Sequence, residues 1–278
     1  MDLEIIAIYC WCDLLLNHLQ IKEDIRAEMS NPEVITTAIV AVRFFYGNFE
    51  NARRFLSQHG YIPNMLSKSR LNRRLHLLGY ELIVDIQGVI GEIFKATNPN
   101  QEYAVDSFPM PVCENIRIFH AKIYKNEKYR GYQASKKRYF YGLKVHMVVT
   151  IDGRPVEFIL TPGSWADISG FKELDLNLPE GSIVYGDKAY TDYVEEDLLA
   201  EAACIELKPQ RRENVKRRFS RCVEYIINHQ RKMVETVFSG IARLFPKHIH
   251  AVTPQGFELK VALFACSACF SVLIPTVN

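Results

Sequence analysis

Three acidic residues stand at places where a catalytic sheet presents metal ligands. Asp106 lies near the end of the alternating run "EYAVDSFP", and Asp187 follows the apolar run "SIVYG". Glu235 lies beside the apolar stripe of a long helical pattern, at about 100° per residue. Close carboxylates repel one another unless a cation lies between them. Because oxygen ligands suit Mg²⁺ or Mn²⁺, the three acids predict a metal-dependent site.

Each acid also has an ordinary interpretation. An aspartate after an apolar run is usually a turn or cap residue, and a glutamate beside a helix stripe is usually solvated. Asp167, which begins a short helical pattern after "TPGSW", is expected to be an N-cap rather than a fourth ligand. A catalytic role is favoured because Asp106, Asp187 and Glu235 occupy such positions together, within a single order of strands and helices.

The elements that must position these acids begin after the polar break "TNPNQ", where the hydrophobic period changes. Five strands are expected, over 102–109, 139–150, 154–163, 182–187 and 204–209. The turn "DG" joins the second to the third, and helical patterns follow the third, fourth and fifth. The order β-β-β-α-β-α-β-α is that of the ribonuclease H-like fold, an α/β fold with a mixed sheet. In it the first and fourth strands are neighbours, which brings Asp106 and Asp187 together.

Residues 1–98 read as an all-helical domain that precedes this sheet. One amphipathic helix within it has a basic face, which favours a helix-turn-helix-like DNA-binding domain, although many helical bundles share the pattern. The basic face consists of Lys68, Arg70, Arg73 and Arg74. We therefore expect a DNA-binding domain over 1–98 and a catalytic domain over 99–278 that includes the C-terminal helix.

Charge is unevenly distributed along a chain whose net charge is only +2. The stretches 53–74, 114–144 and 208–232 carry local excesses of +6, +7 and +7, whereas 191–206 holds six acids and no Lys or Arg. Separated basic stretches favour a polyanionic partner. The competing interpretation for any single stretch is a solvated surface.

The cysteines and the apolar runs argue against zinc-finger, membrane and secreted proteins. The seven cysteines include one CxxC pair without a second pair at zinc-finger spacing, so buried reduced thiols are expected. The longest apolar run, 261–275, is shorter than a membrane span and is expected to be a core helix. No signal peptide pattern opens the chain. These features predict a cytoplasmic protein without a membrane partner.

The sequence resembles the DDE transposases of the bacterial insertion-sequence family numbered 982. The likeness rests on "VDSFPMPVCENIRI", on the stretch from "YGLKVHMVVT" to "IVYGDKAYTDYVEEDLL", and on "RKMVETVFSGIARLFPKHIHAVTPQGFELKVALF". It covers about residues 30–264, including "SKSRLNRRLHLLG" in the helical part. The final segment, "CSACFSVLIPTVN", departs from the family pattern.

The resemblance implies a DDE triad of Asp106, Asp187 and Glu235, separated by 81 (187 − 106) and 48 (235 − 187) positions. It implies two Mg²⁺ or Mn²⁺ ions, with Asp106 bridging both, that activate water to cut DNA and then the freed 3′-hydroxyl to attack target DNA. The partners implied are double-stranded DNA, as terminal inverted repeats and target, and further copies of the chain in a dimer or larger assembly.

Further residues are implied as phosphate contacts. The Arg-x-x-x-Glu pattern of related transposases is kept as Arg231 and Glu235, whereas Asn228 replaces the usual tyrosine and Arg243 is one position from the expected cation. Lys188 is expected either at the scissile strand or in solvent. The stretch "KNEKYRGYQASKKRYFYG" is expected either to contact unstacked bases or to form an exposed loop. The remaining candidate DNA contacts are Lys136, Lys137, Arg138, Arg211 and Arg212.

Two other functions compete with a transposase. One is a ribonuclease H-like nuclease without strand transfer, and the other is a copy that binds element ends without cutting them. Gly186 is expected to leave room for metal or phosphate near the backbone.

Overall fold

The computed structural model describes residues 1–113, 115–133, 136–246 and 249–274, apart from the side chains of residues 115 and 231–234. The chain divides into two compact units, one of residues 1–90 with 243–278 and one of residues 91–242. By its contacts the C-terminal helix belongs with the N-terminal helices and not, as expected, with the sheet. The division into a DNA-binding and a catalytic domain remains a prediction.

The first unit is helical. It contains α1 (Asp2–His18), α2 (Asn31–Phe45), α3 (Phe49–Gln58), most of α4 (Lys68–Ala96) and α8 (Pro254–Leu273). Ser30 caps α2 through a capping box with Glu33, and Thr253 caps α8 by accepting a bond from the N–H of Gly256. Helical geometry breaks inside α4 at Gly79, whose φ of 83° lies in the left-handed region. The break divides α4 into two helical segments.

The helix α8 is long and apolar enough to cross a membrane, but 72% of its apolar window is buried inside the protein. It packs against α2 in the first unit. A buried core helix passes the same test of length and composition as a membrane span. The burial agrees with the predicted core helix.

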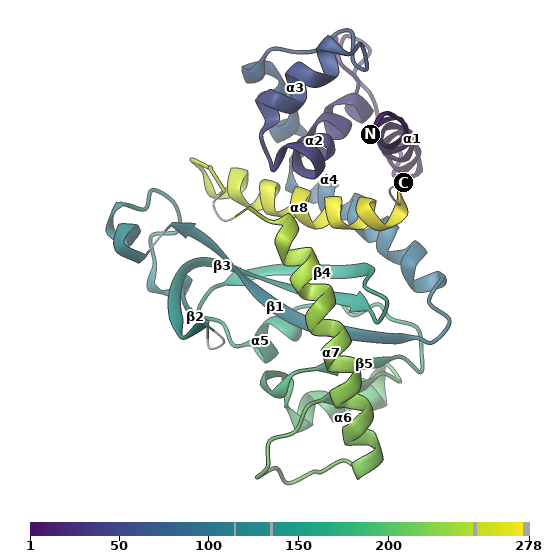
Figure 1. The fold of residues 1–278 in the computed structure, drawn as a ribbon, viewed down its shortest axis with the longest axis vertical. Coiled ribbons are helices and arrows are strands. Elements are labelled where there is room, and N and C mark those ends of the chain that lie inside the picture. Colours follow the sequence, from purple (N-terminus) through teal and green to yellow (C-terminus); the bar gives the residue numbers. More distant parts are fainter. Residues whose placement is uncertain (114, 134–135, 247–248, 275–278) are drawn as a thin grey trace. The chain divides into compact units, whose positions relative to one another are not determined.

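The second unit is a mixed sheet with helices, which confirms the predicted α/β class (Figure 1). Its strands are β1 (Glu102–Cys113), β2 (Arg130–Gln133), β3 (Arg138–Thr150), β4 (Pro155–Pro162), β5 (Ile183–Gly186) and β6 (Glu206–Pro209). Its helices are α5 (Asp167–Phe171), α6 (Tyr193–Ala202), α7 (Arg221–Leu244) and the 3₁₀ turns η1 (Asn115–His120), η2 (Glu127–Tyr129) and η4 (Lys188–Tyr190).

The strand order places β1 at the centre of the sheet. It pairs antiparallel with β3 and parallel with β5, and β5 pairs parallel with β6. The other edge of β3 is shared by β2 at its start and β4 further along. The pairing of β1 with β5 confirms the predicted neighbours, whereas β2 was not predicted.

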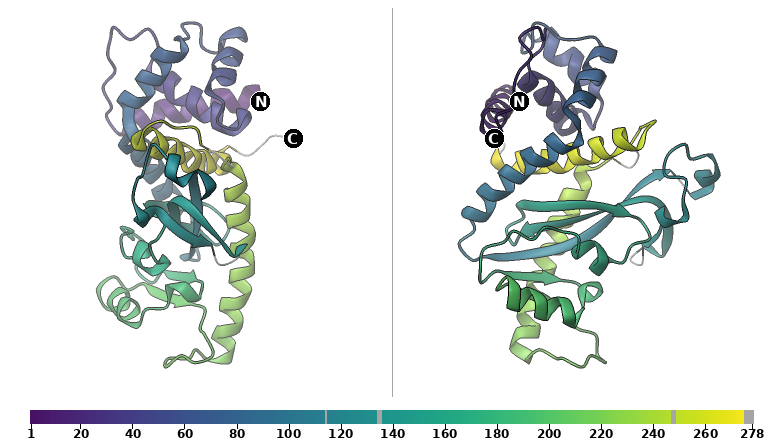
Figure 2. Two further views of the ribbon diagram at one scale, coloured as in Figure 1. Left: turned by 90° about the vertical axis from the view of Figure 1, so that its left-hand side faces the viewer. Right: turned by 180° about the vertical axis from the view of Figure 1, so that it is seen from behind.

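Helices cover both faces of this sheet. In Figure 2, α7 runs along one face while α5 and α6 lie on the opposite side. Consecutive residues of β1 and β3 are buried on both faces of the sheet, including Tyr103, Ala104, Val148 and Val149. Asp192 caps α6 by accepting bonds from the N–H groups of Val194 and Glu195, as its position in the sequence predicts.

Candidate functional site

The parallel pairing of β1 with β5 fixes where the two aspartates lie. Glu102 pairs with Ile183 and Ala104 with Tyr185, an offset of 81 residues (183 − 102). The same offset separates Asp106 from Asp187. The paired residues end at Ala104 and Tyr185, and continuing the same offset by two residues leads to Asp106 and Asp187, so both aspartates follow the ladder at the same end of the two strands. Both residues line the same cleft.

Asp187 is also a turn residue. It is the N-cap of η4, and its Oδ1 accepts a hydrogen bond of 2.6 Å from the N–H of Ala189. This bond fixes one carboxylate oxygen and leaves the other available. The turn and ligand interpretations of Asp187 are compatible with each other.

Gly186 lines the cleft together with Asp187, and its role in leaving room for metal or phosphate stays a prediction. The structure adds a second reason for a glycine, because a Cβ at this position would approach the side chain of Tyr190 to 3.1 Å. Tyr190 is fully buried. The glycine permits η4 to fold back closely against the strand.

The third acid is carried by α7 on the face of Asp106. Glu102 lies on the same face of β1 as Asp106, because the two residues are four positions apart. Its carboxylate accepts bonds from the hydroxyl of Tyr185 (2.9 Å) and from Nε2 of Gln230 on α7 (3.3 Å). Further along α7, Phe238 and Ile241 are buried and Glu235 is exposed. The helix is thus held against the sheet by its apolar stripe, with Glu235 beside that stripe as predicted.

The three acids line one cleft of about 630 Å³. Its other described lining includes Ser107, Lys144 and Asp167 on one side and Tyr132, Gln133 and Lys136 on another. Within the described residues, no group of three or more His, Cys, Asp or Glu side chains stands close enough to hold one ion. The donors are nevertheless all carboxylate oxygens, which fit a hard divalent cation. Asp106 and Asp187 could hold it, with Glu235 lining the same cleft.

Asp167 does not cap its helix, which corrects the expectation from sequence. Ala166 is the N-cap of α5, and Asp167 Oδ1 accepts bonds from the hydroxyl of Ser107 (2.6 Å) and from Nζ of Lys144 (2.9 Å). Ser107 directly follows Asp106. Lys144 and His146 lie on the same face of β3, and His146 pairs with Ser107 in the strand register.

Neutral groups lie beneath the acids. Burial, and then the charges of Asp106, Asp167 and Asp187, raise the pKa of Tyr190 well above its ordinary value. Burial lowers the pKa of His146 to about 4, and its Nε2 lies 2.8 Å from the hydroxyl of Thr161. Both side chains are therefore uncharged at neutral pH, so they add no charge to the cleft.

Several predicted DNA contacts are instead occupied within the protein. Arg211 is only 4% exposed and makes a two-pronged ion pair with Glu196. Arg74 donates to the side chain of Asn31 (2.8 Å) and to the carbonyl of Met29 (3.3 Å). These bonds argue against DNA contacts by either arginine, because a phosphate would have to displace them.

The other predicted cations are more accessible. Lys136 lines the acidic cleft, and Arg70 forms an exposed pair with Glu28. The side chain of Arg231 lies outside the described residues. The remaining cations are exposed, namely Lys68, Arg73, Lys137, Arg138, Lys188, Arg212 and Arg243.

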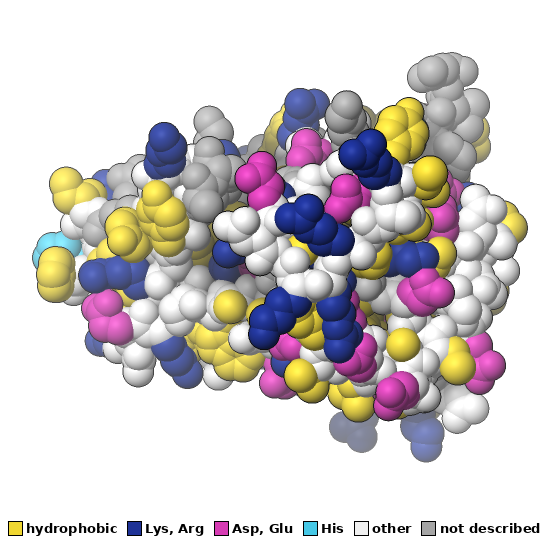
Figure 3. All heavy atoms as spheres, turned by 90° about the horizontal axis from the view of Figure 1, so that it is seen from below, with side chains coloured by type: hydrophobic (Ala, Val, Ile, Leu, Met, Phe, Trp, Pro, Cys, Tyr) yellow, Lys and Arg dark blue, Asp and Glu magenta, His cyan; other side chains and the backbone are white. Residues whose placement is uncertain are grey.

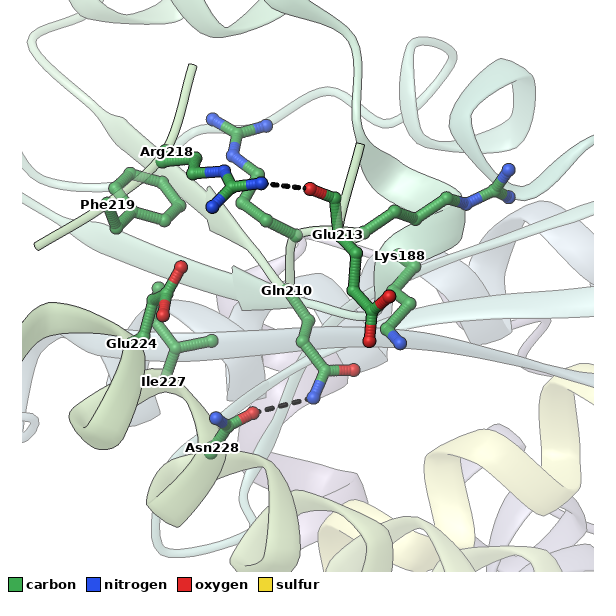
Figure 4. Close-up of a pocket in the computed structure, with 10 residues that line it drawn as sticks. Lys188, Gln210, Glu213, Arg218, Phe219, Glu224, Ile227 and Asn228 are labelled. Atoms are coloured by element: carbon green, nitrogen blue, oxygen red, sulfur yellow. Dashed lines mark hydrogen bonds between the residues drawn. The ribbon is translucent and has the colours of Figure 1, made fainter. Parts of the chain in front are cut away.

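Lys188 lines a second pocket, whose walls come from the segment after β6 and from α7 (Figure 4). There Gln210 Nε2 donates to Asn228 Oδ1 at 2.6 Å, and Arg218 donates to the carbonyl of Glu213. Asn228, which replaces the expected tyrosine, is thus tied to Gln210. This position of Lys188 favours neither of its two predicted roles.

The acidic helix α6 neutralises part of the basic stretch 208–232. Besides the pair of Arg211 with Glu196, Arg217 donates from its two terminal nitrogens, Nη1 and Nη2, to the two carboxylate oxygens of Asp197. On the face drawn in Figure 3, Lys and Arg side chains are interspersed with Asp and Glu side chains. The local excess counted along the sequence therefore overstates the charge that this stretch offers to DNA.

The comparison with protein families identifies one match. The family model described as a transposase DDE domain matches residues 96–248, which are 153 of the 278 residues. No curated protein and no solved structure matches the chain. The matched range contains Asp106, Asp187 and Glu235.

Proposed function

The chain belongs to the transposase DDE domain family, and on that premise we propose that it cuts DNA at the ends of an insertion sequence and joins the freed 3′-hydroxyl to target DNA. Family membership gives the general class, a nucleic-acid-cleaving transposase that acts on DNA. The strand-transfer reaction, the insertion-sequence family numbered 982, and a ribonuclease H-like fold for residues 99–278 are parts of the proposal.

One observation carries the assignment of the site. Asp106 and Asp187 follow the paired residues of β1 and β5 at the same offset, and both line one cleft with Glu235 of α7. In the proposal these three residues are the catalytic acids, and they hold two Mg²⁺ or Mn²⁺ ions that supply Lewis-acid activation of oxygen nucleophiles. The bond from the N–H of Ala189 to one oxygen of Asp187 limits the rotation of this carboxylate.

The helical unit is proposed to bind the terminal inverted repeats, and two or more copies of the chain are proposed to act together on paired ends in the cytoplasm. Lys68 and Arg73 support this proposal because both are exposed on the first part of α4. Arg74 is not among the proposed DNA contacts, because its guanidinium group donates bonds to Met29 and Asn31.

The proposal is tested by incubating the full chain with DNA that carries the flanking terminal repeats, in Mg²⁺ or Mn²⁺. Sequencing gels should show nicks at the element ends and joined products that need the metal. Cleavage without joined products would identify a nuclease, and bound but intact DNA would identify a binding copy. Either result contradicts the proposed reaction.

The role of α4 predicts a change in salt dependence. Replacing Lys68 and Arg73 together with alanine should weaken binding to end DNA and reduce the slope of log K against log salt by about two, because each phosphate contact releases about one counterion. Fluorescence anisotropy across a salt series measures this slope. Arg54→Ala is the matched control, since Arg54 is exposed but already paired with Glu50. An unchanged slope in the double variant would remove α4 from the DNA interface.

A further inference from the structure

An exposed pair of tyrosines stands on the hairpin of β2 and β3. Tyr132 and Tyr139 are directly opposite in the strand register, and their ring centroids are 4.9 Å apart at an interplanar angle of 56°. The two residues are 50% and 59% exposed. Aromatic rings of this size usually contribute to a core or an interface. Because half of each remains in solvent, the pair is available to a ligand.

The hairpin borders the acidic cleft. Tyr132, Gln133 and Lys136 line the same cleft as Asp106 and Asp187. Lys137 and Arg138 follow on the hairpin and are exposed. Flat aromatic faces and cations therefore lie together beside the three acids.

The support under the tyrosines is closely packed. A Cβ on Gly131 would lie 2.2 Å from the carbonyl oxygen of Gly163 and 2.4 Å from the ring of Phe140. The hydroxyl of Tyr141 accepts a bond from the N–H of Asn126 (3.1 Å), which ties the preceding segment to β3. This packing holds the base of the hairpin in place, so the rings are presented on a fixed support.

We propose that Tyr132 and Tyr139 bind unpaired DNA bases next to the scissile phosphate, an inference that rests on the proposed function. Aromatic side chains stack on bases regardless of their sequence, and cations nearby contact the connecting phosphates. Bases inside a duplex are stacked on one another and do not offer their faces. The ligand is therefore a short single-stranded tail or a melted end that lies beside the cleft.

The test compares tailed with blunt DNA. The full chain carrying Asp187→Asn, which should not cut, is mixed with a duplex that has a four-nucleotide tail containing 2-aminopurine, and with the same duplex without the tail. Tyr132→Ala combined with Tyr139→Ala should weaken binding of the tailed DNA by about tenfold or more and abolish quenching of the 2-aminopurine. Binding of the blunt duplex should change less than about twofold, because the phosphate contacts persist.

Matched variants separate stacking from folding. Phenylalanine at both positions keeps the ring faces and should retain tail binding and quenching, whereas leucine keeps apolar volume and should lose them. Tyr225→Ala is the control, since Tyr225 is 73% exposed on α7, outside the hairpin of β2 and β3. Equal losses on tailed and blunt DNA, or leucine variants that bind and quench like the original, would overturn the inference.

The outcome is independent of cleavage. If the original chain quenches the tail through the tyrosines but never cuts DNA, the base site stands and the proposed reaction fails. If it cuts and joins DNA while the alanine variants bind and quench normally, the base site fails alone.

Discussion

Asp187→Asn should lower metal-dependent cleavage and joining by at least about a thousandfold, because it removes one carboxylate charge that would hold the ion. Asparagine keeps an oxygen that can accept the bond from the N–H of Ala189, so η4 should stay folded. Binding of end DNA should persist, since the predicted end contacts lie on α4. Gel assays of cleavage and anisotropy of binding, made on the same preparation, measure the two effects.

Asp192→Asn is the matched control for this substitution. Asp192 is also a helix N-cap, and it pairs with Lys172 at an exposed site. Loss of the Asp192 charge should leave the cleavage rate within about twofold of the original, because no acid of the cleft is changed. An exposed ion pair contributes only about 0–1 kcal/mol to stability, so the variant should also stay folded. Cleavage by Asp187→Asn at more than a tenth of the original rate would show that Asp187 is not a catalytic acid.

Lys95→Met should destabilise the second unit by about 3–5 kcal/mol, because it leaves a buried carboxylate without its partner. The ammonium of Lys95 is 5% exposed and donates to Glu157 Oε1 (2.6 Å), Glu92 Oε1 (2.8 Å) and the carbonyl of Asn177 (2.8 Å). Glu157 is itself only 15% exposed. Urea unfolding followed by circular dichroism should show a lower midpoint with an unchanged m-value.

Two further variants test the cause of that loss. Lys172→Met removes a lysine that also pairs with two carboxylates, Asp192 and Glu195, but is 40% exposed, so it should cost less than about 1 kcal/mol. Adding Glu157→Gln to Lys95→Met should recover part of the stability, because the unpaired buried charge is removed. If Lys95→Met costs no more than Lys172→Met, the buried pair is not a major source of stability.

Lys95 should also make the stability of the fold fall at alkaline pH. Burial lowers the pKa of Lys95, but the hydrogen bonds that its ammonium donates to Glu157 and Glu92 outweigh burial and raise this pKa overall. A raised folded-state pKa means that the folded protein holds the proton more tightly than the unfolded chain. The stabilisation is therefore full below the ordinary lysine pKa and is lost as pH rises through the folded value.

The sheet and its pairing could be predicted because local pattern decides them. Alternation in 102–109 and the turn at Asp152–Gly153 mark strands directly, and the order of elements makes β1 and β5 neighbours. Local pattern did not reveal β2, whose four residues include Gly131 and carry no clear periodicity. Its position depends on packing against Phe140, its partner across the hairpin, and against Gly163, which lies 32 residues (163 − 131) further along the chain.

Side-chain partners account for the other differences between expectation and structure. Asp167 looked like a cap because its partners, Ser107 and Lys144, lie 60 and 23 residues away. Arg211 looked free because Glu196 approaches it only after α6 folds beside β6. Tertiary contacts of this kind leave no periodic signal, so a charge count assigns such residues to a ligand.

The matching offset of β1 and β5 has a consequence for how this chain can vary. The 80 residues between Asp106 and Asp187 include β2, β3, β4, α5 and β5, and loops among them can gain or lose residues without moving either aspartate in space. The position of the two aspartates therefore depends on the ladder between β1 and β5 and not on the count of 81. A slip of β5 by one residue would turn Asp187 to the opposite face and separate the acids, although every residue of the triad would still be present.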